Sequence, residues 1–252
     1  MSCDPAKSTD GSGRAGASGP VRTASAGPAS GPSAGRASGS SAGPTAGPSA
    51  GPTAEFWQER FASGRTPWDR GEVNPALEPL IARGAFPAGA LVLVPGCGAG
   101  HEVARLAAEG CRVLAVDYAP GAVALTRERL ARAGLDAQVV EADLLEWTPP
   151  EPLDAIWDQA CLCALHPDRW TTYATRLADW TSPGGLLALL AVQVEREGRR
   201  QGFIEGPPYH CDVNAMRALF SSSAWKWPKP PYESRAHRSG FAELELLLTR
   251  LG

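Results

Sequence analysis

Predicted strands and helices alternate from residue 90 onward, and this order constrains the fold more than any other feature of the sequence. Five apolar runs have the length of buried strands: residues 90–96, 111–117, 137–143, 153–159 and 186–194. Segments with apolar residues at helical spacing cover residues 100–110, 120–134 and 168–180. Such alternation predicts an α/β fold of the Rossmann-like kind, in which helices cover both faces of a mostly parallel sheet.

A glycine-rich loop follows the first predicted strand. In "VPGCGAGHE", Gly96, Gly98 and Gly100 stand where the chain must turn tightly and approach a ligand closely. A dinucleotide fingerprint, G-x-G-x-x-G, would place its third glycine at His101. The observed spacing therefore favours S-adenosylmethionine over a nicotinamide dinucleotide as the cofactor.

Acidic residues end the next two predicted strands. Asp117 closes the second strand, where a carboxylate would accept hydrogen bonds from ribose hydroxyls. Asp143 closes the third, a position suited to hydrogen bonding near an adenine. Because ligands bind beyond the carboxyl ends of parallel strands, the loop and the two acids together predict a nucleoside site. The alternative is a tight turn with incidental surface acids.

Residues 1–54 differ in composition from the rest of the chain. They contain no Leu, Ile, Phe, Trp or Tyr and are mostly Gly, Pro, Ser and Ala. Such a segment buries too little apolar surface to offset its ordering entropy, so we expect a disordered tail followed by one domain at 55–252. The tail lacks the apolar stretch of a secretory signal, and its Gly and Pro content argues against an organelle-targeting helix.

Charge, hydropathy and cysteine usage exclude several classes of protein. The segment 1–54 holds four of the 24 basic and two of the 27 acidic residues, which leaves the domain a net charge of about −5 and disfavours nucleic acid as a partner. No apolar run reaches the roughly 18 residues of a membrane span. The six cysteines show no CxxC spacing, so we expect reduced thiols, a cytoplasmic location and no metal site.

Five segments in order resemble the thiopurine S-methyltransferase family, including its thiol and halide methyltransferase branch. They are "FWQERF…TPWDRG…NPAL", "LVLVPGCGAGHEVARLAAEG", "VLAVDYAPGAV", "LDAIWDQACLCALHPDRWTTYATRL" and "GPPYHCDVNAMRALF". The closing "HRSGFAELELLL" resembles the last strand of the family. The resemblance covers nearly all of the chain after residue 55 and implies a class I methyltransferase fold, with an antiparallel last strand and S-adenosylmethionine as cofactor.

The resemblance also implies a role for the aromatic segment that precedes the glycine loop. In this family the segment folds over the bound cofactor, and the matching positions here are Trp57, Phe61 and Trp68. Aromatic faces stabilise a nearby cation, such as a sulfonium, by about 0.5 to 2 kcal/mol. Phe61 stands where the family usually has tryptophan. The alternative for Trp57 is a hydrophobic staple that anchors a first helix.

By the same resemblance, five further positions would contact the cofactor. Gly96 and Asp117 would line its methionine and ribose parts, and Asp143-Leu144 its adenine part. Gln159, which follows Asp158 at the end of the fourth strand, would lie close to the reacting methyl group. Thiopurine enzymes commonly have arginine there, and a neutral Gln159 cannot hold a substrate carboxylate as a bidentate arginine would.

We nominate no catalytic acid or base, because a thiolate or halide is already a competent nucleophile. Tyr209 and His210 could border the acceptor, and Asp69 could orient a water molecule. The alternatives are a surface histidine for His210 and a cap or turn partner for Asp69. A nucleophilic role for Cys97, Cys161 or Cys163 would need a lowered thiol pKa, which the sequence does not show.

The sequence therefore predicts a monomeric S-adenosylmethionine-dependent methyltransferase that acts on a small soft nucleophile, preferably a thiol or a halide. Acceptors related to thiopurines or to selenium and tellurium species are the alternative within that class. A nicotinamide-dependent oxidoreductase is a second hypothesis, opposed by His101. A protein that binds S-adenosylmethionine without turnover is a third, suggested by the departures at Phe61 and Gln159.

Overall fold

The computed structural model describes residues 51–237 and 239–252, all of which belong to the unit Pro48–Gly252. The predicted disordered tail lies outside the described residues except for its last four. The first helix, α1, spans Ala54–Ala62, and Thr53 caps it by accepting a hydrogen bond from the backbone N–H of Phe56. The boundary between tail and domain at 54/55 remains a prediction.

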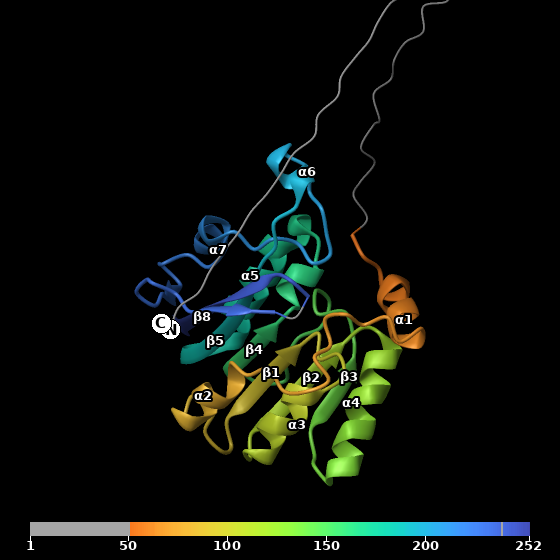
Figure 1. The fold of residues 1–252 in the computed structure, drawn as a ribbon. Coiled ribbons are helices and arrows are strands. Elements are labelled where there is room, and N and C mark those ends of the chain that lie inside the picture. The colour runs from red at the N-terminus through yellow and green to blue at the C-terminus, as the bar shows by residue number, and fades with distance from the viewer. Residues whose placement is uncertain (1–50, 238) are drawn as a thin grey trace, which may run out of the picture. The chain divides into compact units, whose positions relative to one another are not determined.

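The core of the domain is one sheet of eight strands in the order β3-β2-β1-β4-β5-β8-β6, with β7 pairing with β8 outside this path (Figure 1). The bounds are β1 Leu91–Pro95, β2 Arg112–Asp117, β3 Gln138–Glu141, β4 Leu153–Gln159, β5 Thr181–Gln193, β6 Trp225–Lys226, β7 Ser234–Ala236 and β8 Ala242–Arg250. Strands β1 to β5 pair in parallel, whereas β6, β7 and β8 add antiparallel pairs. The predicted fold class, including the antiparallel last strand, is confirmed.

Helices cover both faces of the sheet because alternate strand residues point to opposite sides. Leu91 and Leu93 of β1 belong to one buried cluster, with α5 and α7, and Val92 and Val94 to another, with α2, α3 and α4. The helix bounds are α2 Leu77–Ala82, α3 His101–Ala108, α4 Pro120–Ala133, α5 Trp170–Trp180, α6 Glu197–Arg200 and α7 Val213–Leu219, with 3₁₀ turns at Leu162–Ala164 and Pro167–Arg169. No described helix is long and apolar enough to cross a membrane.

The Pro183-Gly184-Gly185 segment lies between the predicted helix at 168–180 and the predicted strand at 186–194. Helix α5 ends at Trp180, and strand β5 begins directly at Thr181 and runs through the segment. Its pairing with β4 shifts register between Leu153 and Ala155, so the extra residues form an irregularity within the strand. Proline and glycine therefore mark a bulge here rather than a loop.

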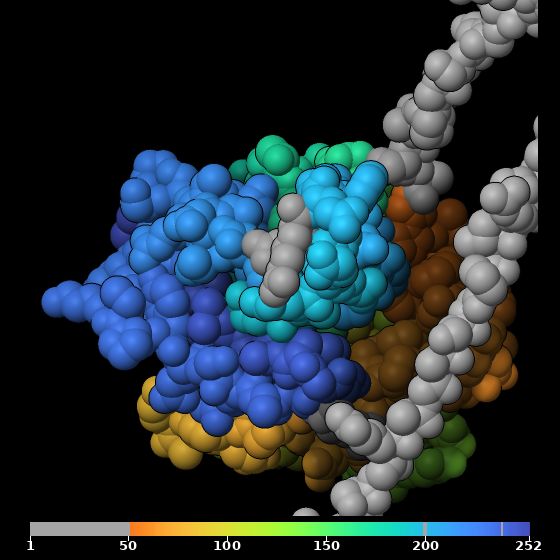
Figure 2. Space-filling view, turned by 45° about the horizontal axis from the view of Figure 1, so that its top comes forward, coloured from red at the N-terminus to blue at the C-terminus, as the bar shows by residue number. Residues whose placement is uncertain are grey.

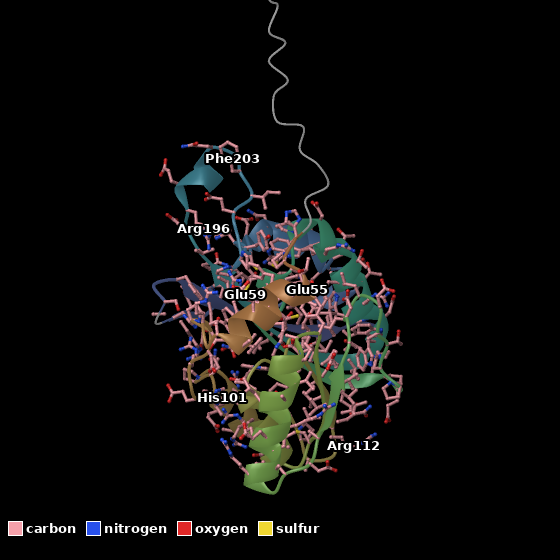
Figure 3. The ribbon with its side chains drawn as sticks, turned by 90° about the vertical axis from the view of Figure 1, so that its right-hand side faces the viewer. Glu55, Glu59, His101, Arg112, Arg196 and Phe203 are labelled. Carbon is pink, nitrogen blue, oxygen red and sulfur yellow. The ribbon has the colours of Figure 1, made fainter. Side chains whose placement is uncertain are left out.

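An arm of residues 194–208 separates β5 from the rest of the C-terminal half. It contains α6 and extends beyond the carboxyl ends of the strands (Figure 1). Phe203 and Ile204, 63% and 60% exposed, lie near its tip, and Figure 3 shows Phe203 far from the sheet. The sequence patterns did not predict this arm.

Candidate functional site

A cavity of about 480 Å³ lies at the carboxyl ends of β1, β2, β4 and β5. Its walls come from α1 and the following segment, the glycine loop, the ends of the strands, the arm and the β7–β8 hairpin. In Figure 2 the orange-brown segment after residue 50, the cyan arm and the blue C-terminal strands lie beside one another on one face. The volume falls within the range of about 300–1,000 Å³ that is typical of small-molecule sites.

The glycine loop is held in place by the acid at the end of β2. Asp117 accepts hydrogen bonds from the backbone N–H of Gly98 at 3.1 Å and of Ala119 at 2.9 Å. It is buried, and burial raises the pKa of its carboxyl above the ordinary value. Gly96, Gly98 and Asp117 all line the cavity, as the strand-end argument predicts.

Gly100 lies outside the cavity lining and has a packing role instead. It precedes α3 with φ +73°, and a Cβ there would lie 2.7 Å from Oγ1 and 2.9 Å from Cα of Thr126 in α4. Glycine therefore lets α3 and α4 approach each other just behind the loop. A direct contact between Gly100 and a cofactor receives no support from this geometry.

Trp57, Phe61 and Trp68 form an aromatic roof over the cavity, which all three line. The Trp57 and Trp68 rings meet edge to face with centroids 5.2 Å apart, and Phe61 meets Trp68 in the same way at 5.9 Å. Trp68 thus connects α1 to the rest of the domain. Trp68, Gly98 and Asp117 line the same cavity, so the roof lies on the same side of the domain as the glycine loop.

Helix α1 docks through a few specific contacts, because none of its residues is buried. Gln58 Oε1 accepts a 2.7 Å hydrogen bond from the backbone N–H of Gly121, in the first turn of α4. The Tyr118 hydroxyl donates to the carbonyl of Pro52 at 3.0 Å, just before α1. Tyr118, the residue after Asp117, therefore ties the start of the roof to the end of β2.

Asp69, next to Trp68, is a hydrogen-bonding partner within the protein. Its Oδ1 lies 2.9 Å from Nε2 of His101 and accepts the backbone N–H of Gly71 at 2.8 Å. Burial, together with the charge of Arg129, lowers the pKa of His101. Asp69 does line the cavity, but its geometry fits the turn-partner alternative better than the orientation of a water molecule.

The remaining predicted cofactor positions also face the cavity. Asp143 and Leu144 lie just beyond β3, where the Asp143 carboxylate accepts the backbone N–H of Leu145 at 2.8 Å. Gln159, the last residue of β4, is half-buried in the wall. Asp158 before it is fully buried and accepts a hydrogen bond from the Tyr173 hydroxyl at 2.9 Å, so it supports the wall from behind.

Tyr209 and His210 do not line the cavity; Pro207 and Pro208 occupy that place instead. Tyr209 is buried edge to face against His166, and its backbone N–H donates to the carbonyl of Cys163. His210 Nδ1 lies 3.1 Å from the backbone nitrogen of Val194, at the base of the arm. Both side chains thus hold the GPPY segment in place, which leaves the two prolines to face the cavity.

The part of the cavity between the 3₁₀ turns, β5, the arm and the hairpin is mainly apolar. We call it the acceptor half, and its apolar members are Leu165, Val192, Val194, Pro207, Pro208 and Phe241. Cys97, Cys161 and Cys163 line the wall nearby, and burial raises the pKa of each thiol. These thiols are poor nucleophiles because the thiolate is the reactive form.

Among the polar side chains of the walls that sequence reasoning missed are Arg70, Glu102 and Tyr118. Each directly follows or lies near a residue that was singled out: Asp69, His101 and Asp117. Adjacency to these positions was the available signal. In the part of the chain that the structure describes, no group of three or more side chains is arranged to hold a metal ion.

Comparisons with known proteins agree with this geometry. A family model described as Thiopurine S-methyltransferase (TPMT) matches residues 52–243. Probable thiol methyltransferase 2 of Arabidopsis thaliana is 31% identical over 161 residues, covering 63% of this chain and 68% of that protein. Thiocyanate methyltransferase 1 of the same plant is 28% identical over 172 residues, covering 68% and 73%.

A solved structure supports the fold independently. Magnesium protoporphyrin IX methyltransferase from Synechocystis, determined with bound S-adenosylhomocysteine, superimposes with a TM-score of 0.61 at 17% identity. The match covers 79% of this chain and 99% of that one. The family match spans most of the chain and includes the roof, the loop and the GPPY segment. The chain therefore belongs to the thiopurine S-methyltransferase family of S-adenosylmethionine-dependent methyltransferases.

Proposed function

We propose that the protein transfers the methyl group of S-adenosylmethionine to a small soft nucleophile, preferably a thiol or a halide. The observation that carries the proposal is the acceptor half, a largely apolar recess that adjoins Gln159 and the aromatic roof in the same cavity. A large, polarisable nucleophile loses little hydration on entering such a recess, whereas a hard, strongly hydrated one loses much more.

The residues present fit the cofactor. The Gly96 and Gly98 backbone leaves room for close approach, and the Asp117 carboxylate lines the cavity at the end of β2, where ribose hydroxyls would meet it. Asp143 and Leu144 would hold the adenine, and the roof would cover the sulfonium. When bound, the cofactor supplies an electrophilic methyl group on a positively charged sulfur.

The protein contributes alignment and exclusion of water rather than strong acid–base chemistry. Gln159, the roof and the apolar wall would fix the approach of the nucleophile in line with the methyl group and the leaving sulfur. The roof would exclude water from the bound ligands, so that the opposite charges of the nucleophile and the sulfonium would neutralise each other in a medium of low polarity. Because Cys161 and Cys163 have raised thiol pKa values, a direct transfer fits better than a methylated-cysteine intermediate.

The curated relatives support a soft acceptor. Their names state a thiol and thiocyanate as the methyl acceptors, and both are sulfur nucleophiles. The neutral Gln159 in the wall lacks the charge with which an arginine would bind a carboxylate. We therefore place simple thiols and halides ahead of anionic, thiopurine-like acceptors.

An acceptor panel tests the proposal. The protein is incubated with cofactor labelled on the methyl group and with alkyl and aryl thiols, iodide, thiocyanate, a thiopurine, selenite or tellurite. Label in the product of at least one thiol or halide is the expected result. Tight binding of S-adenosylhomocysteine without transfer to any member would favour a non-catalytic binding protein, and transfer only to the thiopurine would reverse the ranking of acceptors.

We further propose that the protein acts as a monomer in the cytoplasm on a small molecule, without a nucleic-acid or membrane partner. The net charge of about −5 over the domain supports the exclusion of nucleic acid. Light scattering during gel filtration tests the monomer, since a mass near twice 26.4 kDa would contradict it.

A further inference from the structure

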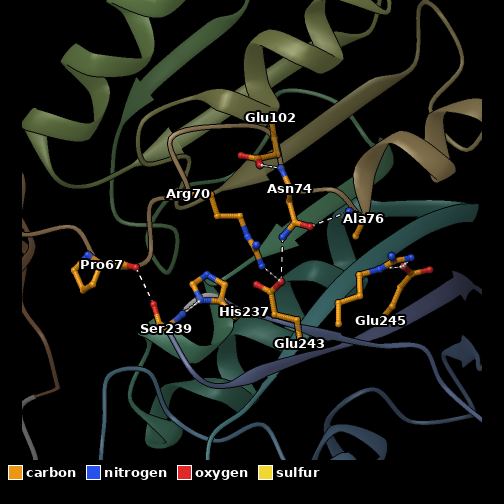
Figure 4. Close-up of polar contacts among 10 residues, drawn as sticks. Pro67, Arg70, Asn74, Ala76, Glu102, His237, Ser239, Glu243 and Glu245 are labelled. Atoms are coloured by element: carbon orange, nitrogen blue, oxygen red, sulfur yellow. Dashed lines mark hydrogen bonds and ion pairs between the residues drawn. The ribbon is translucent and has the colours of Figure 1, made fainter. Parts of the chain in front are cut away.

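Arg70 lies at the glycine-loop end of the cavity, between two contacts with the first turn of α3. Its neighbour Asp69 bonds to His101, and the backbone N–H of Asn74 donates to Glu102 Oε1 at 2.8 Å. Helix α3 begins directly after the glycine loop. The segment that carries Arg70 is thus held against the start of α3, next to the loop, and Figure 4 shows the contact of Asn74 with Glu102 beside Arg70.

The Arg70 guanidinium is only partly used by the protein. Its side chain is 11% exposed, and Nη2 forms a 2.9 Å ion pair with Oε2 of Glu243, which also accepts from Asn74 Nδ2 at 3.1 Å. Within the described residues, Nε has no partner and Nη1 forms no hydrogen bond. An arginine has five N–H donors, and leaving several unmatched in a nearly dry wall is unfavourable unless a ligand meets them.

Glu102 is a second polar group of the same wall with unused capacity. It lines the cavity, and burial raises the pKa of its carboxyl. The N–H of Asn74 satisfies only part of what an ionised carboxylate can accept. A cation from the ligand would stabilise the ionised form of this group.

A zwitterion matches these two groups. The cofactor ends in an amino acid that carries a carboxylate and an ammonium on one carbon atom, so it needs one cationic and one anionic partner close together. A guanidinium presents its donors in a planar fork that suits a carboxylate, and a carboxylate suits an ammonium. The other arginines of the cavity are placed differently: Arg60 lies over the Phe56 ring, and Arg196 is on the arm next to Pro207 and Pro208.

We propose that Arg70 and Glu102 form the subsite for the amino-acid end of the cofactor, with Arg70 Nη1 donating to its carboxylate and the Glu102 carboxylate accepting from its ammonium. The Arg70–Glu243 pair orients the guanidinium for this contact. The subsite rests on the cofactor of the family and not on the identity of the acceptor, so a wrong acceptor would leave it intact.

Calorimetric titration with two ligands tests the subsite without turnover. S-adenosylhomocysteine has the amino-acid end, whereas 5′-methylthioadenosine shares the nucleoside and thioether but lacks it. Arg70→Met should weaken S-adenosylhomocysteine by about 10- to 100-fold, as expected for lost hydrogen bonds between charged groups, and change 5′-methylthioadenosine little. Glu102→Gln should show the same selectivity with a smaller loss.

Two further variants complete the test. Arg196→Gln removes another arginine of the same cavity and serves as the control, so it should not discriminate between the two ligands. Glu243→Gln breaks the ion pair that orients Arg70, so it should weaken S-adenosylhomocysteine more than 5′-methylthioadenosine. Should Arg70→Met fail to fold by circular dichroism, Arg70→Lys, which keeps the charge but loses the fork, takes its place with the same expected selectivity. Equal weakening of both ligands would reduce Arg70 to a structural anchor, and unchanged S-adenosylhomocysteine affinity with a raised acceptor KM would assign it to the acceptor; either result overturns the proposal.

Discussion

Replacing Gly121 by alanine should weaken cofactor binding with little effect on the stability of the free domain. Gly121 lies in the first turn of α4, and its backbone N–H donates to Gln58 of α1. A Cβ added there would lie 2.8 Å from Cβ of Phe61 and 3.1 Å from Oε1 of Gln58. Since the first of these atoms is fixed by the α1 backbone, the helix has to move away.

The size of the effect follows from how weakly α1 is attached. Relieving a clash of this kind costs roughly 1–3 kcal/mol, and α1 has no buried residue to resist displacement. Moving α1 shifts Trp57 and Phe61 away from the sulfonium, and each cation–aromatic contact is worth about 0.5–2 kcal/mol. We expect a net loss of about 1–2 kcal/mol, or roughly 5- to 30-fold in the dissociation constant of S-adenosylmethionine. In the free protein, the preference of a helix for alanine over glycine, about 0.5–1 kcal/mol, offsets part of the cost of displacing α1.

Calorimetric titration combined with thermal melts of the free protein measures both effects. The matched control is Gly134→Ala at the other end of α4, where φ is +63° and a Cβ would meet nothing within 4 Å. That variant should lower the melting temperature through backbone strain and leave cofactor affinity unchanged. Unchanged affinity in Gly121→Ala, or a melting temperature that falls as far as in the control, would refute the argument that α1 closes the site.

Three further predictions concern buried ionisable groups. Asp117→Ala should weaken S-adenosylhomocysteine binding by about 1–3 kcal/mol in calorimetry. It should also lower the melting temperature, because the carboxylate accepts two backbone N–H groups. Unchanged affinity would mean that the nucleoside does not bind at Asp117. The pKa of His101 is lowered from 6.5 by burial and Arg129, so the unfolded chain takes up that proton first and stability should fall as the pH drops below 6.5. In thermal melts from pH 8 to 5, the melting temperature should fall less steeply with decreasing pH in His101→Gln than in wild type. Equal pH dependence of the two proteins would contradict this. Burial raises the pKa of Asp158 from 3.8 to about 6, so the folded protein holds a proton there and wild-type stability should decline as the pH rises through that window. The free energy of unfolding of Asp158→Asn, measured with urea, should therefore rise relative to that of wild type between pH 4 and 7. A difference that stays constant over this range would contradict the raised pKa of Asp158.

The order of the strands and the meeting of Gly98, Asp117 and Asp143 at one cavity were predictable because they depend on local patterns. A parallel sheet brings successive strand ends to one edge, so Gly98, Asp117 and Asp143 meet although they are far apart in sequence. Each strand could be recognised from its own apolar run. These predictions required no knowledge of contacts between side chains that are far apart in the sequence.

The acceptor half was less predictable because it depends on single-residue orientation and on long-range pairs. In the GPPY segment the sequence does not show which residues face the cavity, and the structure turns Pro207 and Pro208 inward and Tyr209 away. The Arg70–Glu243 pair joins residues 173 positions apart. No spacing rule indicates such a partner, and the same holds for the 3.0 Å bond from Ser239 Oγ to the carbonyl of Pro67.

His101 shows how one residue can serve both the loop and the roof. It stands where a dinucleotide fingerprint would place its third glycine, and the sequence argument used it only to exclude that class. In the structure its ring meets Asp69, next to Trp68, so the first residue of α3 holds the segment that carries the roof. Gly100, one position earlier, takes over the close packing of α3 against α4. The spacing of this loop thus has a physical reason. Gly100 allows the close contact between α3 and α4, so position 101 can hold a histidine that binds Asp69, next to the roof residue Trp68.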